Sequence, residues 1–161
     1  MKEFSIARRA TLLLSVALLT ACASGVKLDD VAGKSGSGGT DFSSQPWNDP
    51  KSPLFKRSVY FDFDSYTVKS EYQATLQAHA NYLKANKDRK IKIEGNTDER
   101  GTTEYNLALG QRRSEAVRKS LSLLGVPDSQ MEAVSFGKEK PKAQGSNEAA
   151  WQENRRADIA Y

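Results

Sequence analysis

NTDERGTTEYNLALGQRR, residues 96–113, leads from an alternating strand through a tight acidic turn into a long amphipathic helix. At about 3.6 residues per turn, the apolar stripe of this helix consists of Leu109, Ala116, Val117, Leu121 and Leu124. Arg113 falls inside the stripe, and Asn106 lies on the same side, one turn before Leu109. A buried guanidinium without a partner costs roughly several kcal/mol, so an arginine at such a position usually extends its head to water. Because Asp98 stands at the mouth of the same turn, the arrangement favours a binding site over a solvated arginine.

Alternating and helical patterns follow one another along the rest of the chain. The predicted order is a strand at Ser58–Asp64, a helix at Ser70–Asn86, a strand at Lys90–Asn96, a helix at Thr103–Leu124, a strand at Glu132–Gly137, a short helix within Gly145–Asn154 and a strand at Arg156–Tyr161. Ser70 and Gln73 have the spacing of a capping box, and His79 is expected at the rim of the core. This order predicts an α/β fold with a four-stranded mixed sheet (β-α-β-α-β-β) and helices packed on one face.

The predicted topology brings polar residues to one edge of the sheet. Because parallel strands joined by right-handed crossovers point the same way, Asp62, Thr97 and Asp98 should share a rim with the start of the second helix. Open α/β sheets commonly bind ligands at this edge. Unpaired N–H groups at the helix start favour a carboxylate there, and Gly101 lets the backbone turn and approach closely.

Composition limits the possible functions. The chain has 161 residues, of which 38% are hydrophobic, and carries 24 Lys and Arg against 20 Asp and Glu. These totals suit one globular domain with appendages, and so small a basic excess does not argue for a nucleic-acid partner. A single cysteine and a single histidine exclude an intramolecular disulfide and argue against a Cys/His zinc site. We predict neither a metal nor a cofactor.

The N-terminal part of the chain has the pattern of a targeting segment and a tether. Basic residues precede the apolar run Ala10–Leu19, as in a secretory signal peptide. LTAC, residues 19–22, resembles a bacterial lipobox, which implies that Cys22 becomes a lipid-modified N-terminus; the alternative is an ordinary signal peptide that contains a cysteine. The residues that follow, up to Pro53, are rich in Gly, Ser and Pro and predict a flexible tether. We therefore divide the chain into a signal peptide (1–21), a lipidated tether (22–53) and a folded domain (54–161).

The central stretch also resembles the peptidoglycan-binding signature of OmpA-like domains. TDERG at 97–101 and NLALGQRR at 106–113 carry the resemblance, and FDFD at 61–64, FGKEKP at 136–141 and NRR at 154–156 extend it over the whole domain. With the lipobox and the tether, the match is to the peptidoglycan-associated lipoproteins of this family. The resemblance implies a non-enzymatic outer-membrane lipoprotein with its folded domain in the periplasm. Such a protein binds the meso-diaminopimelate of the peptidoglycan stem peptide and links membrane to cell wall in the Tol-Pal system, with TolB, a periplasmic propeller protein, as partner.

The same resemblance implies roles for individual residues. Asp98 matches the aspartate that holds the diaminopimelate ammonium, and Arg113 matches the arginine that holds its carboxylate. The remaining candidates are Asn106 as a polar contact, Thr97, Phe61 and Asp62 in the pocket wall, and Arg156 on the last strand. Asn96 stands where many relatives have His and receives no specific role. Gly110 stands where others have Ser and should weaken the helix slightly.

Two other functions stay open at the level of sequence. Asp98 and Glu99 could supply the acid and base of a peptidoglycan-processing hydrolase, although the folded domain contains no Ser-His or Cys-His pair. The domain could also be a protein–protein module, with Tyr66, Tyr105 and the segment Lys138–Lys142 as its surface, which is compatible with ligand binding. Incubation with sacculi separates a hydrolase, which releases fragments, from a binder, which sediments with them.

Overall fold

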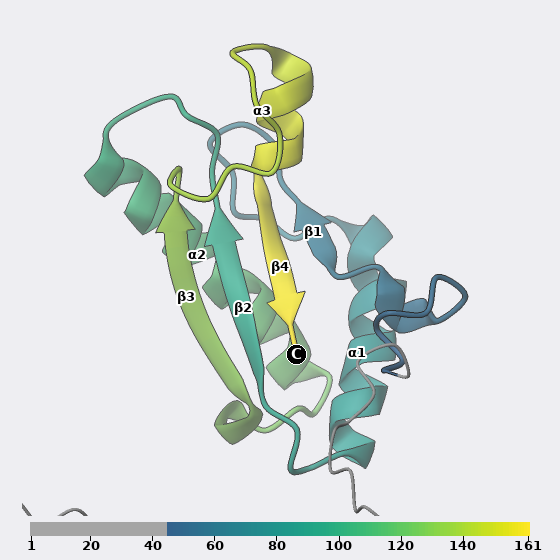
Figure 1. Cartoon of the computed structure of the whole chain (residues 1–161). Helices are drawn as coiled ribbons and strands as arrows, with labels where there is room; N and C mark the ends of the chain where they lie inside the picture. The colour runs from purple at the N-terminus through teal and green to yellow at the C-terminus, as the bar shows by residue number, and fades with distance from the viewer. Residues whose placement is uncertain (1–44) are drawn as a thin grey trace, which may run out of the picture. The chain divides into compact units, whose positions relative to one another are not determined.

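The computed structural model describes residues 45–161, so the predicted signal peptide, Cys22 and the first part of the predicted tether lie outside the described residues. Within them the main elements are β1 (Ser58–Tyr60), α1 (Gln73–Ala85), β2 (Ile91–Asn96), α2 (Thr103–Leu123), β3 (Met131–Gly137), α3 (Glu148–Asn154) and β4 (Arg156–Ala160) (Figure 1). Short 3₁₀ turns stand at Pro53–Phe55, Ser70–Tyr72 and Asp128–Gln130. None of the helices described here has the length and apolar character needed to cross a membrane.

The strands form one mixed sheet in the order β1-β4-β2-β3. β2 and β3 are parallel, with Ile91 opposite Met131, whereas β4 runs antiparallel to both β1 and β2. The predicted α/β class, the mixed four-stranded sheet and the order of the elements are therefore confirmed. β1 and β2 point the same way, as expected, but β4 lies between them. Its first residues, Arg156 and Ala157, consequently lie beside the ends of both strands.

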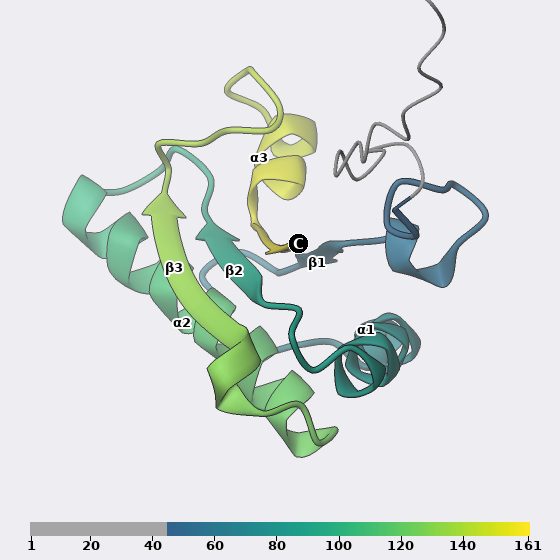
Figure 2. The same cartoon turned by 60° about the horizontal axis from the view of Figure 1, so that its bottom comes forward.

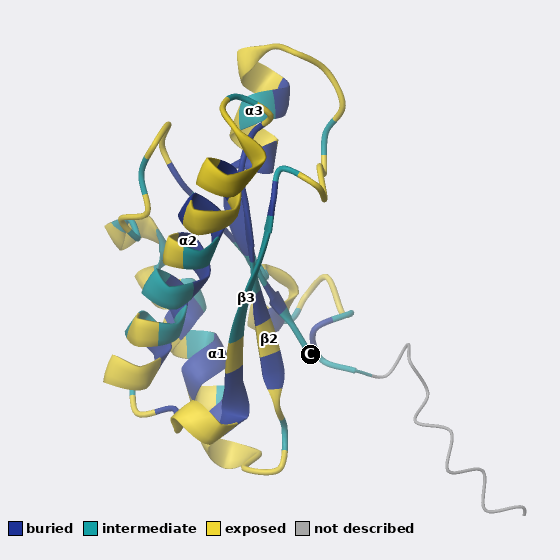
Figure 3. Ribbon diagram, turned by 90° about the vertical axis from the view of Figure 1, so that its left-hand side faces the viewer, coloured by how far each residue is buried: buried dark blue, intermediate teal, exposed yellow. Residues whose placement is uncertain are grey.

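The hydrophobic core lies between the sheet and helices α1 and α2, which cover the same face (Figures 2 and 3). Along β2 the side chains alternate, so Ile91 and Ile93 are buried whereas Lys92 and Glu94 belong to the other, polar face. The helices contribute residues at helical spacing, namely Leu76, Ala80 and Leu83 from α1 and Val117 and Leu121 from α2. This one-sided burial fixes which face of α2 meets the sheet.

Two glycines bring α2 close to β2. A Cβ on Gly95 would lie 1.8 Å from the Gly110 carbonyl oxygen, and a Cβ on Gly110 would lie 2.3 Å from Ser135 Oγ. Only glycine at both positions therefore lets the helix rest directly on the strand. Although Gly110 lowers the intrinsic helix propensity, it sets the distance between the sheet and Arg113, which follows three residues later.

The packed domain begins before Pro53, the predicted end of the tether. Trp47 is only 6% exposed, and its ring stacks on Tyr161 with the centroids 4.2 Å apart. Tyr82 packs edge-on against the same indole at 5.9 Å, and the Arg89 guanidinium lies 5.0 Å from it. The predicted tether boundary is thus corrected to before Trp47. Pro and Gly nearby suggested a segment without a core, but this indole finds its partners at the other end of the chain.

Two expectations about α1 are wrong. Ser70 opens a 3₁₀ turn and α1 begins at Gln73, and no side chain caps either start. His79 is fully buried rather than at the rim, with Nδ1 2.6 Å from the Tyr161 hydroxyl and Nε2 2.9 Å from the Lys56 carbonyl oxygen. A carbonyl only accepts, so Nε2 donates and Nδ1 accepts from the hydroxyl. Burial lowers the pKa of His79, which keeps the ring neutral.

Candidate functional site

A cavity of about 260 Å³ opens at the edge of the sheet where the site was expected. Its walls come from the segment after β1, the turn between β2 and α2, and the first half of α2. Four of the sequence-predicted residues line it: Thr97, Asp98, Asn106 and Arg113. The rest of the lining consists of Phe63, Asp64, Arg100, Gly101, Tyr105 and Leu109. The predicted acid and guanidinium therefore border one shared space.

The turn between β2 and α2 is held by its own hydrogen bonds. Gly101 has a φ of +93°, which glycine adopts without strain. Thr102 caps α2, because its hydroxyl accepts from the Tyr105 N–H at 3.2 Å. The Asn106 side-chain amide donates to the Arg100 carbonyl oxygen at 2.8 Å, which ties the first turn of the helix back to the loop.

Arg113 is fully buried and has only neutral hydrogen-bond acceptors in the described part of the chain. Nε donates to the carbonyl oxygen of Ser65 at 2.8 Å, Nη1 to that of Asn96 at 2.8 Å and Nη2 to that of Asp62 at 3.1 Å. Burial lowers the pKa of Arg113 to about 10, although the charge of Asp98 acts in the opposite direction. A guanidinium has five N–H donors, so two remain for a ligand.

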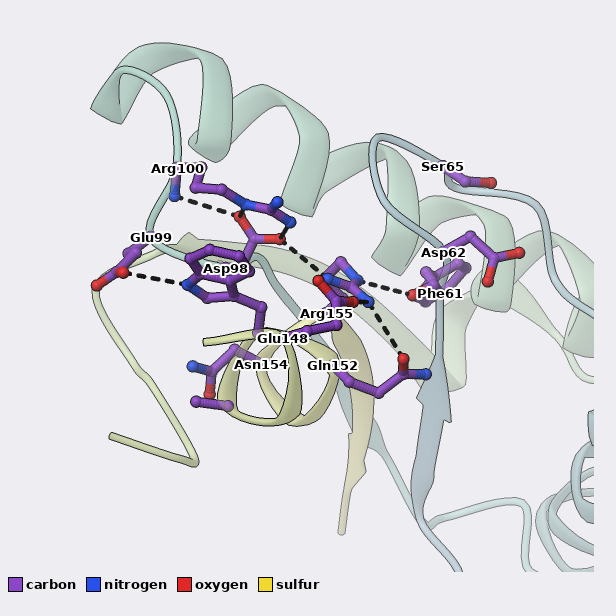
Figure 4. A network of polar contacts seen from close by, with 12 residues as sticks. Phe61, Asp62, Ser65, Asp98, Glu99, Arg100, Glu148, Gln152, Asn154 and Arg155 are labelled. Carbon is purple, nitrogen blue, oxygen red and sulfur yellow. Dashed lines mark hydrogen bonds and ion pairs between the residues drawn. The ribbon is translucent and has the colours of Figure 1, made fainter. Parts of the chain in front are cut away.

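The Asp98 carboxylate, only 5% exposed, is bound by two other arginines (Figure 4). Arg100 contributes Nε at 3.2 Å, Nη2 at 2.7 Å and its backbone N–H at 3.2 Å. Arg155 adds Nη1 at 3.4 Å. Burial raises the pKa of Asp98, but the hydrogen bonds from Arg100 outweigh it and hold the pKa below its usual range. Asp98 is therefore ionised at neutral pH.

Arg155, between α3 and β4, is a site residue that the sequence prediction missed. It is 3% exposed, and besides Asp98 it donates to the Phe61 carbonyl oxygen at 3.2 Å, to Glu148 at 2.6 Å and to Gln152 at 3.2 Å (Figure 4). The residue thus joins β1, α3 and the β2–α2 turn. A guanidinium held by four hydrogen bonds fixes the orientation of the Asp98 carboxylate that it contacts.

Three predicted pocket residues do not line the cavity with their side chains. Arg156 donates to the carboxylate two residues further along, on the polar face of the sheet, because side chains on a strand alternate between faces. Asp62 forms an exposed ion pair with Lys69 at 2.7 Å, and only its carbonyl oxygen meets Arg113. Phe61 is buried, with its ring centroid 5.2 Å from the Arg113 guanidinium carbon.

Two buried polar atoms beside the site have no hydrogen-bond partner among residues 45–161. They are Thr97 Oγ1, on a residue that lines the cavity, and Asn96 Oδ1, one residue earlier. Since buried polar groups are normally satisfied, the end of β2 lacks two hydrogen-bond partners that the described residues do not supply. The described residues contain no cluster of acidic, His or Cys side chains suited to a metal ion. The cavity wall carries both signs of charge, the guanidinium of Arg113 and the carboxylate of Asp98.

Comparisons with known proteins agree with one another. A family model described as the OmpA family matches residues 60–155. The chain is 46% identical over 147 residues to the peptidoglycan-associated lipoprotein of Pasteurella multocida, covering 91% of this chain and 92% of that protein. It is 37% identical over 169 residues to the protein of the same name from Pseudomonas aeruginosa, covering 99% of each.

Solved structures with a similar fold are also found. The crystal structure of the peptidoglycan-associated lipoprotein from Burkholderia pseudomallei is 70% identical, with a TM-score of 0.71, and the match covers 73% of this chain and 99% of that one. The C-terminal domain of Helicobacter pylori MotB is 22% identical with a TM-score of 0.58, covering 63% of this chain and 81% of that one. The second likeness shows the fold alone.

Proposed function

The chain belongs to the OmpA family, and on this basis we propose that it is an envelope lipoprotein whose folded domain binds peptidoglycan non-covalently. The ligand we propose is the meso-diaminopimelate residue of the stem peptide. Its free end carries an ammonium and a carboxylate on one carbon. Such an end fits a cavity that has a guanidinium and a carboxylate in its wall.

The buried guanidinium of Arg113 is the observation that carries this proposal. A buried cation that is bonded only to carbonyl oxygens remains undercompensated, and two of its N–H donors have no acceptor among residues 45–161. A ligand carboxylate supplies the missing negative charge. Each charge-assisted hydrogen bond contributes about 1.5–3 kcal/mol net, so two such bonds account for a recognisable preference for the carboxylated ligand.

The other cavity residues complete the proposed contacts. Asp98 receives the ligand ammonium, the unpartnered Thr97 hydroxyl bonds the carboxylate or the adjacent peptide, and Asn106 holds the loop that frames them. A ligand that lacks one of the two charges leaves one protein charge unpaired. Selectivity then follows from the cost of that mismatch.

The acid–base chemistry of the site favours binding over hydrolysis. A glycosidase needs one carboxylic acid with a raised pKa as proton donor. The pKa of Asp98 is lowered despite its burial, because Arg100 bonds the carboxylate, and the pKa of Glu99 is lowered by hydrogen bonds from Ser146 and Trp151. Neither residue suits the donor role, so the hydrolase alternative is the less favoured one.

The envelope context is part of the same proposal. Lipidation at Cys22 anchors the protein in the outer membrane, and the domain acts in the Tol-Pal system with TolB as a partner. Two exposed aromatic residues, Tyr105 in the cavity wall and Tyr66 beside Arg112, offer contact area for such a partner. Labelling with radioactive palmitate tests the anchor, since Cys22→Ser should lose the label and leave the membrane fraction. Co-purification with TolB tests the partner.

Calorimetric titration of the full-length protein in detergent tests the ligand. We expect the tripeptide containing diaminopimelate to bind at least about tenfold more tightly than its lysine counterpart, which lacks the second carboxylate. The variant Asp98→Asn should lose binding to both. Glu104→Gln, which removes an exposed carboxylate from the first turn of α2, is the matched control and should bind like the unaltered protein. Equal affinity for the two tripeptides would refute the assignment of Arg113.

Sedimentation with purified sacculi tests the whole-wall interaction. We expect the protein to sediment without releasing soluble fragments, and Asp98→Asn to stay in the supernatant while Glu104→Gln sediments. Release of soluble muropeptides by the unaltered protein would instead support the hydrolase.

A further inference from the structure

Arg100 is the most unusual cation at the site. Its guanidinium bonds both oxygens of Asp98 and lies between two aromatic rings, 4.2 Å from the Phe63 centroid and 4.0 Å from the Trp151 centroid. Trp151 is itself held by Glu99, whose carboxylate accepts from the indole Nε1 at 3.1 Å (Figure 4). An aromatic clamp, formed by Phe63 and Trp151, thus keeps a cation of the protein on the carboxylate that the ligand ammonium needs.

We infer that Arg100 occupies the ammonium subsite of the cavity and that a bound ligand must displace it from Asp98. This inference rests on the proposed function, since it specifies how the same site receives its ligand. A carboxylate has room for several donors, but Arg100 takes both oxygens and its backbone N–H takes a further acceptor site. Arg155 holds Asp98 from the buried side, so the position of Arg100 on the cavity wall is the one open to exchange.

The two arginines on Asp98 differ in how firmly they are held. The Arg155 side chain is 4% exposed and has four acceptors, from Asp98, Phe61, Glu148 and Gln152. The Arg100 side chain is 33% exposed, and Asp98 is its one hydrogen-bonding partner among the described residues.

Exchange at Arg100 keeps the charge balance of the site. The Arg100 side chain is one-third exposed, so its head can move to water when the ligand ammonium takes its place on Asp98. The incoming ammonium restores the charge that leaves Asp98, and Arg155 keeps the carboxylate oriented throughout.

If Arg100 must leave Asp98, only ligands that carry an ammonium compete with it. A ligand that brings only a carboxylate can bind Arg113 while Arg100 stays on Asp98. A ligand that brings an ammonium has to compete with Arg100, and its affinity is reduced by that competition. Removal of the Arg100 guanidinium should therefore strengthen binding of ammonium ligands and leave a carboxylate-only ligand unaffected.

Titration of full-length Arg100→Gln in detergent with three tripeptides tests this. They differ only in the third residue, which is diaminopimelate (both charges), lysine (ammonium alone) or 2-aminopimelate (carboxylate alone). We expect Arg100→Gln to bind the first two roughly fivefold more tightly than the unaltered protein, the factor that corresponds to losing a partly exposed competing ion pair. The affinity for 2-aminopimelate should change by less than about twofold. Arg100→Lys, which keeps a charge but cannot bond both oxygens from between two rings, should fall in between.

Lys92→Gln is the matched control for the loss of one positive charge. Its side chain lies on the polar face of the sheet, paired with Glu132 at 3.8 Å, and its affinities should equal those of the unaltered protein. Thermal unfolding of each variant verifies that the domain is intact.

Weaker or unchanged binding of diaminopimelate by Arg100→Gln would overturn the inference, because Arg100 would then assist the ligand or ignore it. A matching gain for 2-aminopimelate would overturn it too, since the effect would not depend on the ammonium. In both cases the unaltered protein still binds, and the proposed function stands. Absence of binding by every variant to every tripeptide would overturn the proposed function and this inference with it.

Discussion

The replacement Arg113→Lys tests whether the shape of the guanidinium, and not only its charge, builds the site. The planar fork of Arg113 reaches three carbonyl oxygens, those of Asp62 and Ser65 in the segment after β1 and that of Asn96 at the end of β2. A lysine ammonium is one point charge and cannot span acceptors arranged around such a fork. We expect at least two of the three carbonyl groups to lose their partner.

The magnitude follows from these bonds. Each buried carbonyl left without a donor costs about 1–3 kcal/mol, so Arg113→Lys should lower the free energy of unfolding by about 2–5 kcal/mol. For a domain of this size, that corresponds to a fall in Tm on the order of 10–20 °C. Since domains are stable by about 5–15 kcal/mol, the variant should still be folded at room temperature. Its affinity for the diaminopimelate tripeptide should fall about 10- to 100-fold, because two-point recognition of the carboxylate is lost.

Thermal unfolding followed by circular dichroism gives the first quantity, and calorimetric titration at 25 °C gives the second. Arg112→Lys is the matched control, because Arg112 is the neighbouring arginine, is exposed and lies 5.8 Å from the Tyr66 ring. It should change stability by less than about 0.5 kcal/mol. If Arg113→Lys kept the Tm and the affinity of the unaltered protein, the fork would not matter and the site would need another anion receptor.

Three further outcomes are expected. The pKa of His79 is lowered in the folded protein, so below about pH 6.5 the unfolded chain binds a proton that the folded chain does not. The free energy of unfolding should therefore fall as the pH drops below about 6.5. His79→Gln should flatten that slope in denaturant titrations between about pH 5 and 7. Gly110→Ala should lower the free energy of unfolding by about 1 kcal/mol net, because a clash costing about 1–3 kcal/mol exceeds the gain of about 1 kcal/mol in helix propensity. The same variant should weaken ligand binding, because the clash moves Arg113. A variant that is more stable in urea unfolding would contradict the close contact of α2 with β2. Trp47→Ala should lower stability by about 2–4 kcal/mol while leaving the tripeptide affinity unchanged in calorimetry, because Trp47 packs against Tyr161, at the end of β4 remote from the cavity.

Four of the cavity-lining residues could be placed from the sequence. The 3.6-residue period put Arg113 on the sheet-facing side of α2, and the strand–turn–helix pattern put Thr97 and Asp98 at the edge where that side ends. Asn106 lies on the same helix face. These four residues come from one continuous stretch, so local periodicity was sufficient to bring them to one cavity.

Residues from distant segments were harder to place. Arg155 and Arg156 are adjacent, and β4 begins at Arg156 as predicted. Arg155 lies just before the strand, where the alternation of strand side chains does not apply, so only the tertiary fold shows that Arg155 faces Asp98. The pairing of Arg100 with Asp98 depends on a turn conformation that the sequence does not specify. Trp47 lacks a periodic context altogether, and only tertiary packing against the last residue reveals its role.

The stacking of Trp47 on Tyr161 has a mechanical consequence. This contact lies at one end of β4, whereas Asp98 and the cavity lie at the other, beside the start of the same strand. A pull between a ligand in the cavity and the residue at position 45 would therefore run along β1 and β4. Interstrand hydrogen bonds lie perpendicular to the strands, so they would share this load in shear instead of breaking one by one. A domain loaded along its strands in this way should resist a steady pull better than one loaded across them.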